Sequence, residues 1–364
     1  MSLDQIATAI DRQDYKTAAQ LLKAWLAQSP HDPWGQFYRA QLLEASGQLN
    51  AAKSIYQTLL KTVTYPKLIV QVRQAIRRIE AHEHAQHQQM IREATADPQN
   101  AEPGSLILEA IDSEKRTIAA QTLARVFKID AYTARMHLPN RGWRLYKRGA
   151  IGELNLYGQQ LQSGNVSAFW TSDRDLQAIP VFEVQYFLND EPQAAVVCQN
   201  EAGQLGSLTF DWSEITQQVR GQLPIFEQVI ESTMRQGVQR QRKEQTQDYV
   251  QICDLHLPAR RCILRLCDWR YRFDQSVELS HSDAMLTELD HSINRFQWNE
   301  LMNFLSDRTP NKPVWSDFAP FAETAIEFPG LLNRIPAKIG SIGQDANLWN
   351  SAFQLYSTLA FVRR

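Results

Sequence analysis

A 34-residue repeat near the N-terminus constrains the fold more than any other feature of the sequence. When the chain is shifted against itself by 34 residues, small or apolar side chains fall on small or apolar side chains. The matched pairs are Ile6 and Ala40, Ala9 and Leu43, Tyr15 and Leu49, Ala18 and Ala52, Leu22 and Tyr56, and Trp25 and Leu59. A period of this length indicates stacked supersecondary units that bury a continuous core between neighbours.

The residue types at these positions suit packed helical hairpins. Small residues such as Ala18 and Ala52 allow two helices to approach closely, and larger side chains fill the remaining space. Gly47 is expected to follow the first helix of the second hairpin, because the left-handed residue that ends a helix is usually glycine. Pro30 is expected to end the first hairpin and Pro33 to open the next helix.

This pattern resembles the tetratricopeptide repeat over residues 1–66. The first hairpin departs from it, since Gln13 and Asp14 stand at its turn and no glycine is present. The resemblance implies a helical array that binds protein partners. With only two copies, we expect a small docking surface, with Trp34 and Tyr38 as contacts, or a dimer interface.

Residues 67–95 predict one long polar helix that caps the array, with no third hairpin. Its inward face is expected to carry Leu68, Val72, Ala75, Ile76 and Ile79. On this helix His84 and His87 are three residues apart and Glu80 lies one turn from His84, so a metal site is conceivable. His82 points to another face and no fourth ligand is near in sequence. We therefore favour a solvated polar face, with no metal and no other cofactor.

Residues 97–105 have the Pro, Asn and Gly content of a linker, and residues 106–231 predict a second region. Its expected elements are a strand at 106–111, helices at 113–128 and 131–138, a strand at 142–148, a helix at 151–163 and a strand at 166–170. This βααβαβ order resembles the C-terminal domain of the ribosomal stalk protein, which implies a second docking module without catalytic chemistry. Further strands are expected at 181–187, 194–199 and 206–210, and a helix at 212–230.

Residues 232–248 are predicted to be a junction and residues 249–364 a third region. Its expected elements are strands at 249–256, 261–267 and 269–274, and helices at 295–305 and 348–361. The core face of the third strand is expected to carry Trp269, Tyr271 and Phe273. With a helical array in residues 1–96, the fold class is predicted to be α+β multidomain.

Composition narrows the functional classes. Lys and Arg total 38 and Asp and Glu total 40, a net charge of −2, so no global field attracts nucleic acid or anionic lipid. No apolar run approaches the ~20 residues that a membrane helix needs, and the N-terminus lacks the basic region of a signal peptide. We expect no membrane insertion and a cytoplasmic location.

Four cysteines do not form a disulfide framework in a chain of 364 residues. Cys253, His256, Cys262 and Cys267 lie close in sequence, but they lack the paired C-x-x-C spacing of a zinc site. Cys262 and Cys267 also fall on opposite faces of one expected strand. Buried core cysteines are the better interpretation.

The stretch 141–148, NRGWRLYKRG with its flanks, is basic and aromatic. Strict alternation would place Arg144, Tyr146 and Arg148 on one face, and Trp143, Leu145 and Lys147 on the other. The plain interpretation is an edge strand protected by charge. The functional one is a contact for an acidic protein partner through Arg141, Arg144 and Arg148. An alternative is a regulator that binds nucleic acid through this stretch and the basic residues 235–243, although the signature of the common RNA-binding sheet is absent.

The chain lacks the phosphate-loop, zinc-protease, hydrolase and dinucleotide-binding motifs, and no enzyme activity is predicted. The favoured interpretation is a protein–protein interaction adaptor or scaffold, with its oligomeric state left open. The whole chain resembles repeat-bearing proteins of cyanobacteria. That resemblance implies assembly or regulation of a larger complex, such as a photosynthetic one.

Overall fold

The computed structural model describes residues 2–233, 239–277, 290–338 and 348–363. The chain divides into two compact units, Met1–Glu93 and Ala94–Arg364. Together they have the α+β architecture predicted from the sequence, a helical array followed by a region of mixed sheets and helices.

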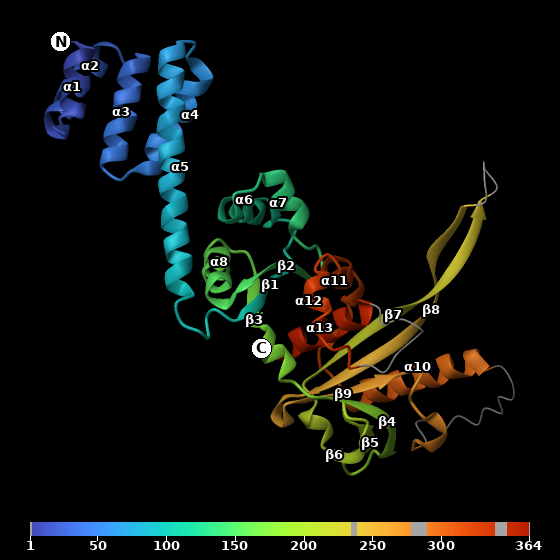
Figure 1. Ribbon diagram of the computed structural model, residues 1–364. Coiled ribbons are helices and arrows are strands. Elements are labelled where there is room, and N and C mark those ends of the chain that lie inside the picture. The colour runs from blue at the N-terminus through green and yellow to red at the C-terminus, as the bar shows by residue number, and fades with distance from the viewer. Residues whose placement is uncertain (1, 234–238, 278–289, 339–347, 364) are drawn as a thin grey trace. The chain divides into compact units, whose positions relative to one another are not determined.

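The N-terminal unit is a helical array (Figure 1). Its elements are α1 (Leu3–Asp11), α2 (Tyr15–Gln28), α3 (Pro33–Ala45), α4 (Leu49–Thr62) and α5 (Pro66–Ala94). A shift of 34 residues places the bounds of α2 on those of α4. The predicted inward face of α5 is confirmed: Leu68, Val72, Ala75 and Ile79 are buried, and Ile76 packs against the same core.

The turns after α1 and α3 have the same backbone geometry, although only one contains glycine. Gly47 has a φ of 80°, and Gln13, 34 residues earlier, has a φ of 60°. In each turn the next amide donates to a carbonyl of the preceding helix, Asp14 to Ala9 at 2.9 Å and Gln48 to Leu43 at 2.8 Å. Gln13 thus holds the left-handed conformation that glycine takes without steric cost.

The C-terminal unit begins with a small sheet covered by helices. Its elements are β1 (Pro103–Glu109), α6 (Arg116–Phe127), α7 (Ala131–His137), β2 (Trp143–Ala150), α8 (Ile151–Ser163) and β3 (Ala168–Ser172). The strand order is β2-β1-β3, with both outer strands antiparallel to β1. The predicted order of elements is confirmed, and α6, α7 and α8 cover one face of the sheet over a core that includes Leu106, Leu123 and Leu154.

A second sheet of seven strands has the order β10-β7-β8-β9-β4-β5-β6. The strands are β4 (Val181–Asn189), β5 (Ala194–Gln199), β6 (Leu205–Phe210), β7 (Gln217–Thr233), β8 (Gln239–Leu257), β9 (Cys262–Cys267) and β10 (Val314–Trp315). The predicted boundaries at 97–105 and 232–248 stay predictions. However, β1 begins inside the first of these ranges, and strands from both sides of the second share this sheet, since Val181 pairs with Ile263.

Helices cover both faces of this larger sheet (Figure 1). One face packs against α10 (Asp290–Arg308) and the other against α11 (Phe318–Ala325), α12 (Pro329–Leu332) and α13 (Leu348–Val362). Gly221 of β7 permits a close approach on the second face. A Cβ atom at this glycine would lie 2.6 Å from the ring of Phe353 and 3.0 Å from that of Phe318.

The helix expected at 212–230 is wrong, because residues 217–230 belong to β7. The polar and apolar residues of this stretch alternate with a period of two. Val219 and Leu223 join the core beneath α11 and α13, whereas Arg220 contacts α10 on the opposite face. Alternation of this kind is the pattern of a strand with two different faces.

The strand expected at 269–274 is also wrong. After β9 the amides of Arg270 and Tyr271 both donate to the carbonyl of Cys267, at 3.0 and 2.9 Å, which turns the chain. As a result Trp269 is 54% exposed and does not share a core face with the buried Tyr271.

The second face of the small sheet is filled within the same unit. Trp143 of β2 has its ring centroid 4.7 Å from that of Trp315 and 5.4 Å from that of Tyr356 on α13. Ile107 and Leu145 belong to the same buried cluster. The apolar face of this sheet is therefore used for packing, and a partner would have to bind elsewhere on this unit.

Candidate protein interaction surfaces

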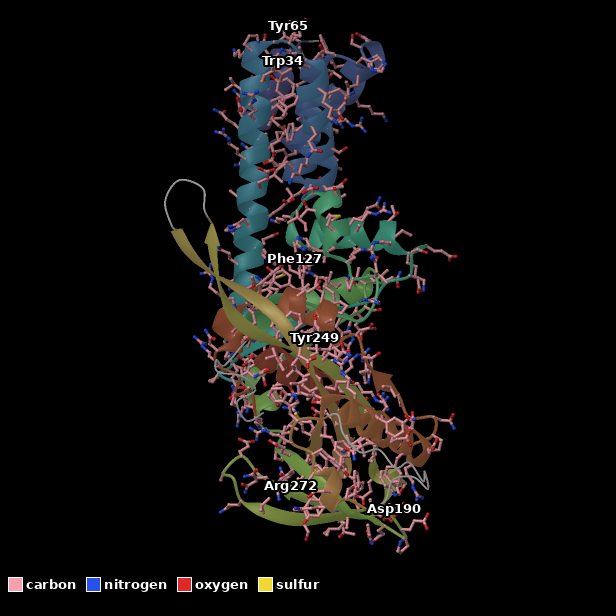
Figure 2. The ribbon with its side chains drawn as sticks, turned by 90° about the vertical axis from the view of Figure 1, so that its right-hand side faces the viewer. Trp34, Tyr65, Phe127, Asp190, Tyr249 and Arg272 are labelled. Atoms are coloured by element: carbon pink, nitrogen blue, oxygen red, sulfur yellow. The ribbon has the colours of Figure 1, made fainter. Side chains whose placement is uncertain are left out.

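An aromatic group on α3 contains both residues predicted as contacts in the repeat array. Phe37 is buried, with its ring centroid 5.7 Å from that of the buried Tyr56. Trp34 and Tyr38 are half-buried, with centroids 6.1 Å apart, and each also contacts Phe37. Figure 2 marks Trp34 within the N-terminal unit. The helix thus holds two half-exposed rings on a buried aromatic floor.

The charges of three carboxylates act on Tyr38. Burial raises the pKa of its hydroxyl, and the charges of Asp4, Asp11 and Asp32 raise it further. The Asp32 carboxylate is already engaged, because it accepts the indole N–H of Trp25 at 3.1 Å. Asp4 and Asp11 are exposed, and no basic side chain of the described chain pairs with them. We call Trp34, Tyr38, Asp4 and Asp11 the α3 aromatic surface.

The three arginines predicted as partner contacts already face carboxylates of their own unit. Arg141 lies 3.9 Å from Asp317, Arg144 lies 3.9 Å from Glu327, and Arg148 pairs with Asp173 through two nitrogens. Arg148 also donates to the Ser105 hydroxyl at 2.9 Å. Carboxylates of the same unit therefore compensate the positive charge that an acidic partner or a nucleic acid would meet on these arginines. Their role as partner contacts stays a prediction. The basic residues 235–243 lie outside the described side chains.

A β-bulge in β2 changes which face of the strand some side chains lie on, compared with the prediction from strict alternation. Leu145 and Lys147 pair with consecutive residues of β1, so Tyr146 is an extra residue. Tyr146 packs on Phe127 with ring centroids 4.7 Å apart. Lys147 lies on that side too, with Nζ 5.5 Å from the centroid of Tyr157. Arg148 therefore does not share a face with Tyr146, as strict alternation had required.

The pair α6 and α7 carries an exposed apolar surface that the sequence analysis missed. Ile118 of α6 is 61% exposed. On α7, Tyr132 is 74% and Met136 is 64% exposed. These two residues are four apart and so share one helical face. This spacing of apolar residues is the sequence pattern from which the exposed surface could have been predicted.

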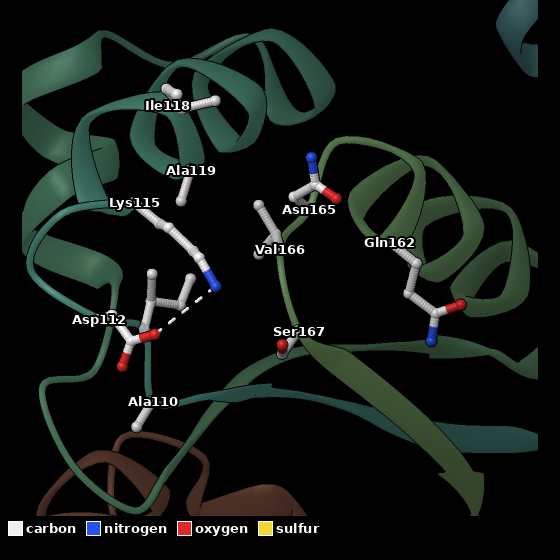
Figure 3. A pocket seen from close by; sticks show the side chains of 10 residues that line it. Ala110, Asp112, Lys115, Ile118, Ala119, Gln162, Asn165, Val166 and Ser167 are labelled. Carbon is white, nitrogen blue, oxygen red and sulfur yellow. Dashed lines mark ion pairs between the residues drawn. The ribbon is translucent and has the colours of Figure 1, made fainter.

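An open cleft of about 540 Å³ lies between the start of α6 and the turn from α8 to β3 (Figure 3). Its lining residues are Ala110, Ile111, Asp112, Lys115, Ile118, Ala119, Gln162, Asn165, Val166 and Ser167. Lys115 and Asp112 form an ion pair at 3.7 Å, and both are exposed. Because the charges of the lining cancel one another, this cleft favours no charged ligand.

His82, His84 and His87 lie on α5. The Nε2 atom of His84 lies 3.4 Å from that of Gln88. Within the described part of the chain, no group of three or more His, Cys, Asp and Glu side chains has the arrangement of a metal site.

Cys253, Cys262 and Cys267 are core residues, as predicted, and Cys198 is buried as well. Cys198, Cys253, Cys262 and Cys267 are all free and buried. Burial raises the pKa of the Cys253 and Cys267 thiols to about 12, so these thiols are protonated and unreactive at neutral pH.

Asp254, His256 and Ser357 have the residue types of a hydrolase triad, but their hydrogen bonds run in a different direction from those of such a triad. The Ser357 hydroxyl donates to Asp254 at 2.5 Å, so the Nε2 of His256, 3.0 Å away, must donate to Ser357. In a nucleophilic triad the serine donates to the histidine instead. The Nδ1 of His256 is then the acceptor for the Gln217 amide at 2.9 Å. Burial lowers the pKa of His256 to about 4, so its ring is neutral at pH 7.

This buried network is a structural element. Arg265 and Asp254, 1% and 0% exposed, form a bidentate pair at 2.7 and 2.8 Å. Arg265 also donates to Gln354 of α13 at 2.9 Å. The network fixes α13 to β8 and β9, and the side chains that form it are buried away from solvent.

The arrangement of α1 to α4 in two hairpins agrees with a comparison against known families. Residues 9–64 match the tetratricopeptide repeat. Such repeats generally mediate protein–protein interaction, and this match confirms the predicted array. No curated protein and no solved structure gave a match. The likenesses to the ribosomal stalk protein and to cyanobacterial repeat proteins stay predictions.

The helices of the described residues were also compared with what a membrane span requires. None of the helices there combines the length and the hydrophobicity that crossing a bilayer requires.

Proposed function

We propose that this protein is a non-catalytic adaptor and that one protein partner docks on the α3 aromatic surface. The observation that carries the proposal is the pair of half-exposed rings, Trp34 and Tyr38, held on the buried floor of Phe37 and Tyr56. Large aromatic side chains dominate interface energetics, since they bury much area and lose little rotamer freedom. The tetratricopeptide match over residues 9–64 supports a protein partner.

The charges at this surface favour a partner segment with basic side chains beside apolar ones. Asp4 and Asp11 are exposed carboxylates close enough to raise the pKa of Tyr38. Complementary charge at the rim of an interface steers association and fixes orientation. An acidic partner for the arginines around β2 has less support, because Arg148 and its neighbours are paired internally. A cytoplasmic role in complex assembly belongs to the same proposal.

The test is affinity purification of the full chain from cells of its source, with quantitative mass spectrometry. Three forms are compared: the natural protein, the double variant Trp34→Ala with Tyr38→Ala, and the control Tyr15→Ala, which removes an exposed ring from α2. We expect proteins that co-purify with the natural form and the control to fall at least tenfold with the double variant. An unchanged set of co-purifying proteins in the double variant would overturn the proposal.

Salt dependence separates the contribution of charge from that of the rings. The variant Asp4→Asn with Asp11→Asn keeps both rings and removes two carboxylates. We expect it to bind the recovered partner more slowly at low salt, with the difference shrinking as salt is raised.

A further inference from the structure

A second open cleft lies between α10, the start of α11 and the neighbouring strands β7 and β8. Its volume is about 450 Å³, within the range of small-molecule sites. It is lined by Arg220, Gly221, Gln222, Gln251, Ile252, Trp298, Asn299, Met302, Asn303, Ser316, Phe318 and Ala319. Arg220 is the single charged side chain of this lining.

The guanidinium of Arg220 is held by neutral acceptors. It donates to the amide oxygen of Gln218 at 2.7 and 3.1 Å, to the Ser306 hydroxyl at 3.0 Å and to the carbonyl of Met302 at 3.4 Å. No Asp or Glu of the described chain forms an ion pair with it. This contrasts with Arg265, whose charge is balanced by Asp254. The positive charge in the cleft is therefore oriented, and no carboxylate among the described side chains compensates it.

Two carboxylates close to this cleft in register or in sequence, Asp254 and Asp317, have other partners than Arg220. Asp254 follows the register partner of Arg220 on β8, but it is engaged by Arg265 in the buried network. Asp317 lies between two lining residues, yet its side chain packs against Gly142 and lies beside Arg141. An anion in the cleft would therefore meet Arg220 without competition from either carboxylate.

The other lining groups suit a small organic anion. The amides of Gln222, Gln251, Asn299 and Asn303 and the hydroxyl of Ser316 offer further hydrogen-bond donors. Trp298, Met302, Phe318 and Ala319 add apolar atoms to the lining. Arginine matches the planar, paired oxygens of carboxylates and phosphates. We propose that this cleft binds a small organic carboxylate or phosphate monoester with an apolar group, and that Arg220 is its counter-ion.

The test uses the full chain with phenyl phosphate, benzoate and inorganic phosphate as probes and neutral benzamide for comparison, all at constant ionic strength. Isothermal titration calorimetry is expected to show one site for phenyl phosphate or benzoate and none for benzamide. Arg220→Gln is expected to weaken binding at least tenfold, whereas the exposed-arginine control Arg272→Gln should leave it unchanged. Inorganic phosphate binding as tightly as phenyl phosphate would contradict the apolar part of the site.

Because Arg220 also links β7 to α10, Arg220→Gln could weaken binding by disturbing the fold. A second variant separates these two causes. Asn303→Asp leaves every hydrogen bond of Arg220 in place and adds a carboxylate at the exposed rim of the cleft. We expect it to weaken anion binding at least tenfold with an unchanged circular dichroism spectrum. The proposal fails if no anionic probe binds, or if binding is the same in both variants as in the natural protein.

Discussion

Arg78 and Glu44, 34 residues apart, form a bidentate ion pair with N–O distances of 2.7 and 2.9 Å. Glu44 lies on α3 and Arg78 on α5, so α5 takes the place of the first helix of a third repeat. The Glu44 carboxylate also accepts the hydroxyl of the buried Tyr56 at 3.2 Å, and burial together with this carboxylate raises the pKa of Tyr56. One acidic side chain thus joins three helices.

We predict that the two halves of this pair differ in their contribution to stability. Glu44→Ala leaves the Tyr56 hydroxyl buried without its acceptor and should cost about 1–3 kcal/mol. Arg78→Ala should cost less than about 1 kcal/mol, because that side chain is largely exposed and the pair is screened by solvent. Hydrogen exchange of the α3 and α4 amides, read by mass spectrometry, measures both. An equal or larger loss for Arg78→Ala would contradict this account.

The two equivalent turns offer a matched pair of substitutions. Gln13→Gly should slow hydrogen exchange at the α1–α2 turn, because it relieves a left-handed φ of 60°. Gly47→Ala should destabilise the α3–α4 hairpin by about 1 kcal/mol, since open space surrounds the position and only the backbone conformation opposes a side chain. Stabilisation by Gly47→Ala would be the contrary result.

The buried pair of Arg265 and Asp254 can be compared with a surface pair of the same geometry. Arg265→Met should cost about 3–5 kcal/mol, because Asp254 remains buried without a counter-ion. Arg260 is bidentate with Glu214 at 2.6 and 2.7 Å but lies at the surface, so Arg260→Met should cost less than about 1 kcal/mol. Urea unfolding followed by tryptophan fluorescence measures the difference. Similar losses in the two variants would show that burial is not the cause.

The neutral His256 predicts a pH dependence of stability. Its pKa is about 4 in the folded state, below the ordinary 6.5, so the unfolded chain binds the additional proton between these values. Stability from this group is complete above pH 6.5 and is lost as the pH falls toward 4, by up to about 3 kcal/mol. Asp268 acts in the opposite direction, because burial raises its pKa from 3.8 to about 6 and its protonation favours the folded state.

Comparison with His256→Gln isolates the histidine from Asp268. The melting temperature of the variant should lie below that of the natural protein at pH 7, and this gap should narrow at pH 4.5. A gap that is the same at both pH values would rule out His256 as the titrating group.

The parts of the fold that follow from local pattern were predictable from the sequence. The small residues Ala18 and Ala52 and the glycine at position 47 identified two hairpins, and turn residues gave the order of elements in the small sheet. The strand β7 was missed, although Val219 and Leu223 alternate with polar residues along it. The seven-stranded sheet depends on pairs such as Val181 with Ile263, which lie far apart in sequence and which no local pattern reveals.

The same distinction applies to the sites. Trp34 and Tyr38 were predicted as contacts from their place in the second hairpin, and the structure places both half-buried on α3, while their contact role stays a prediction. The partners of the three arginines could not be foreseen, since Asp317 and Glu327 lie far away in sequence. Arg220 escaped notice for the related reason that its cleft forms only when α10 and α11 fold against β7.

Docking on the α3 aromatic surface is tested most directly by hydrogen exchange of the full chain, with and without the protein that co-purifies with it. The account predicts slower exchange in α1 and α3 on binding, with little change at the start of α2 around Tyr15. Protection confined to residues 94–364, with α1 and α3 unchanged, would contradict it.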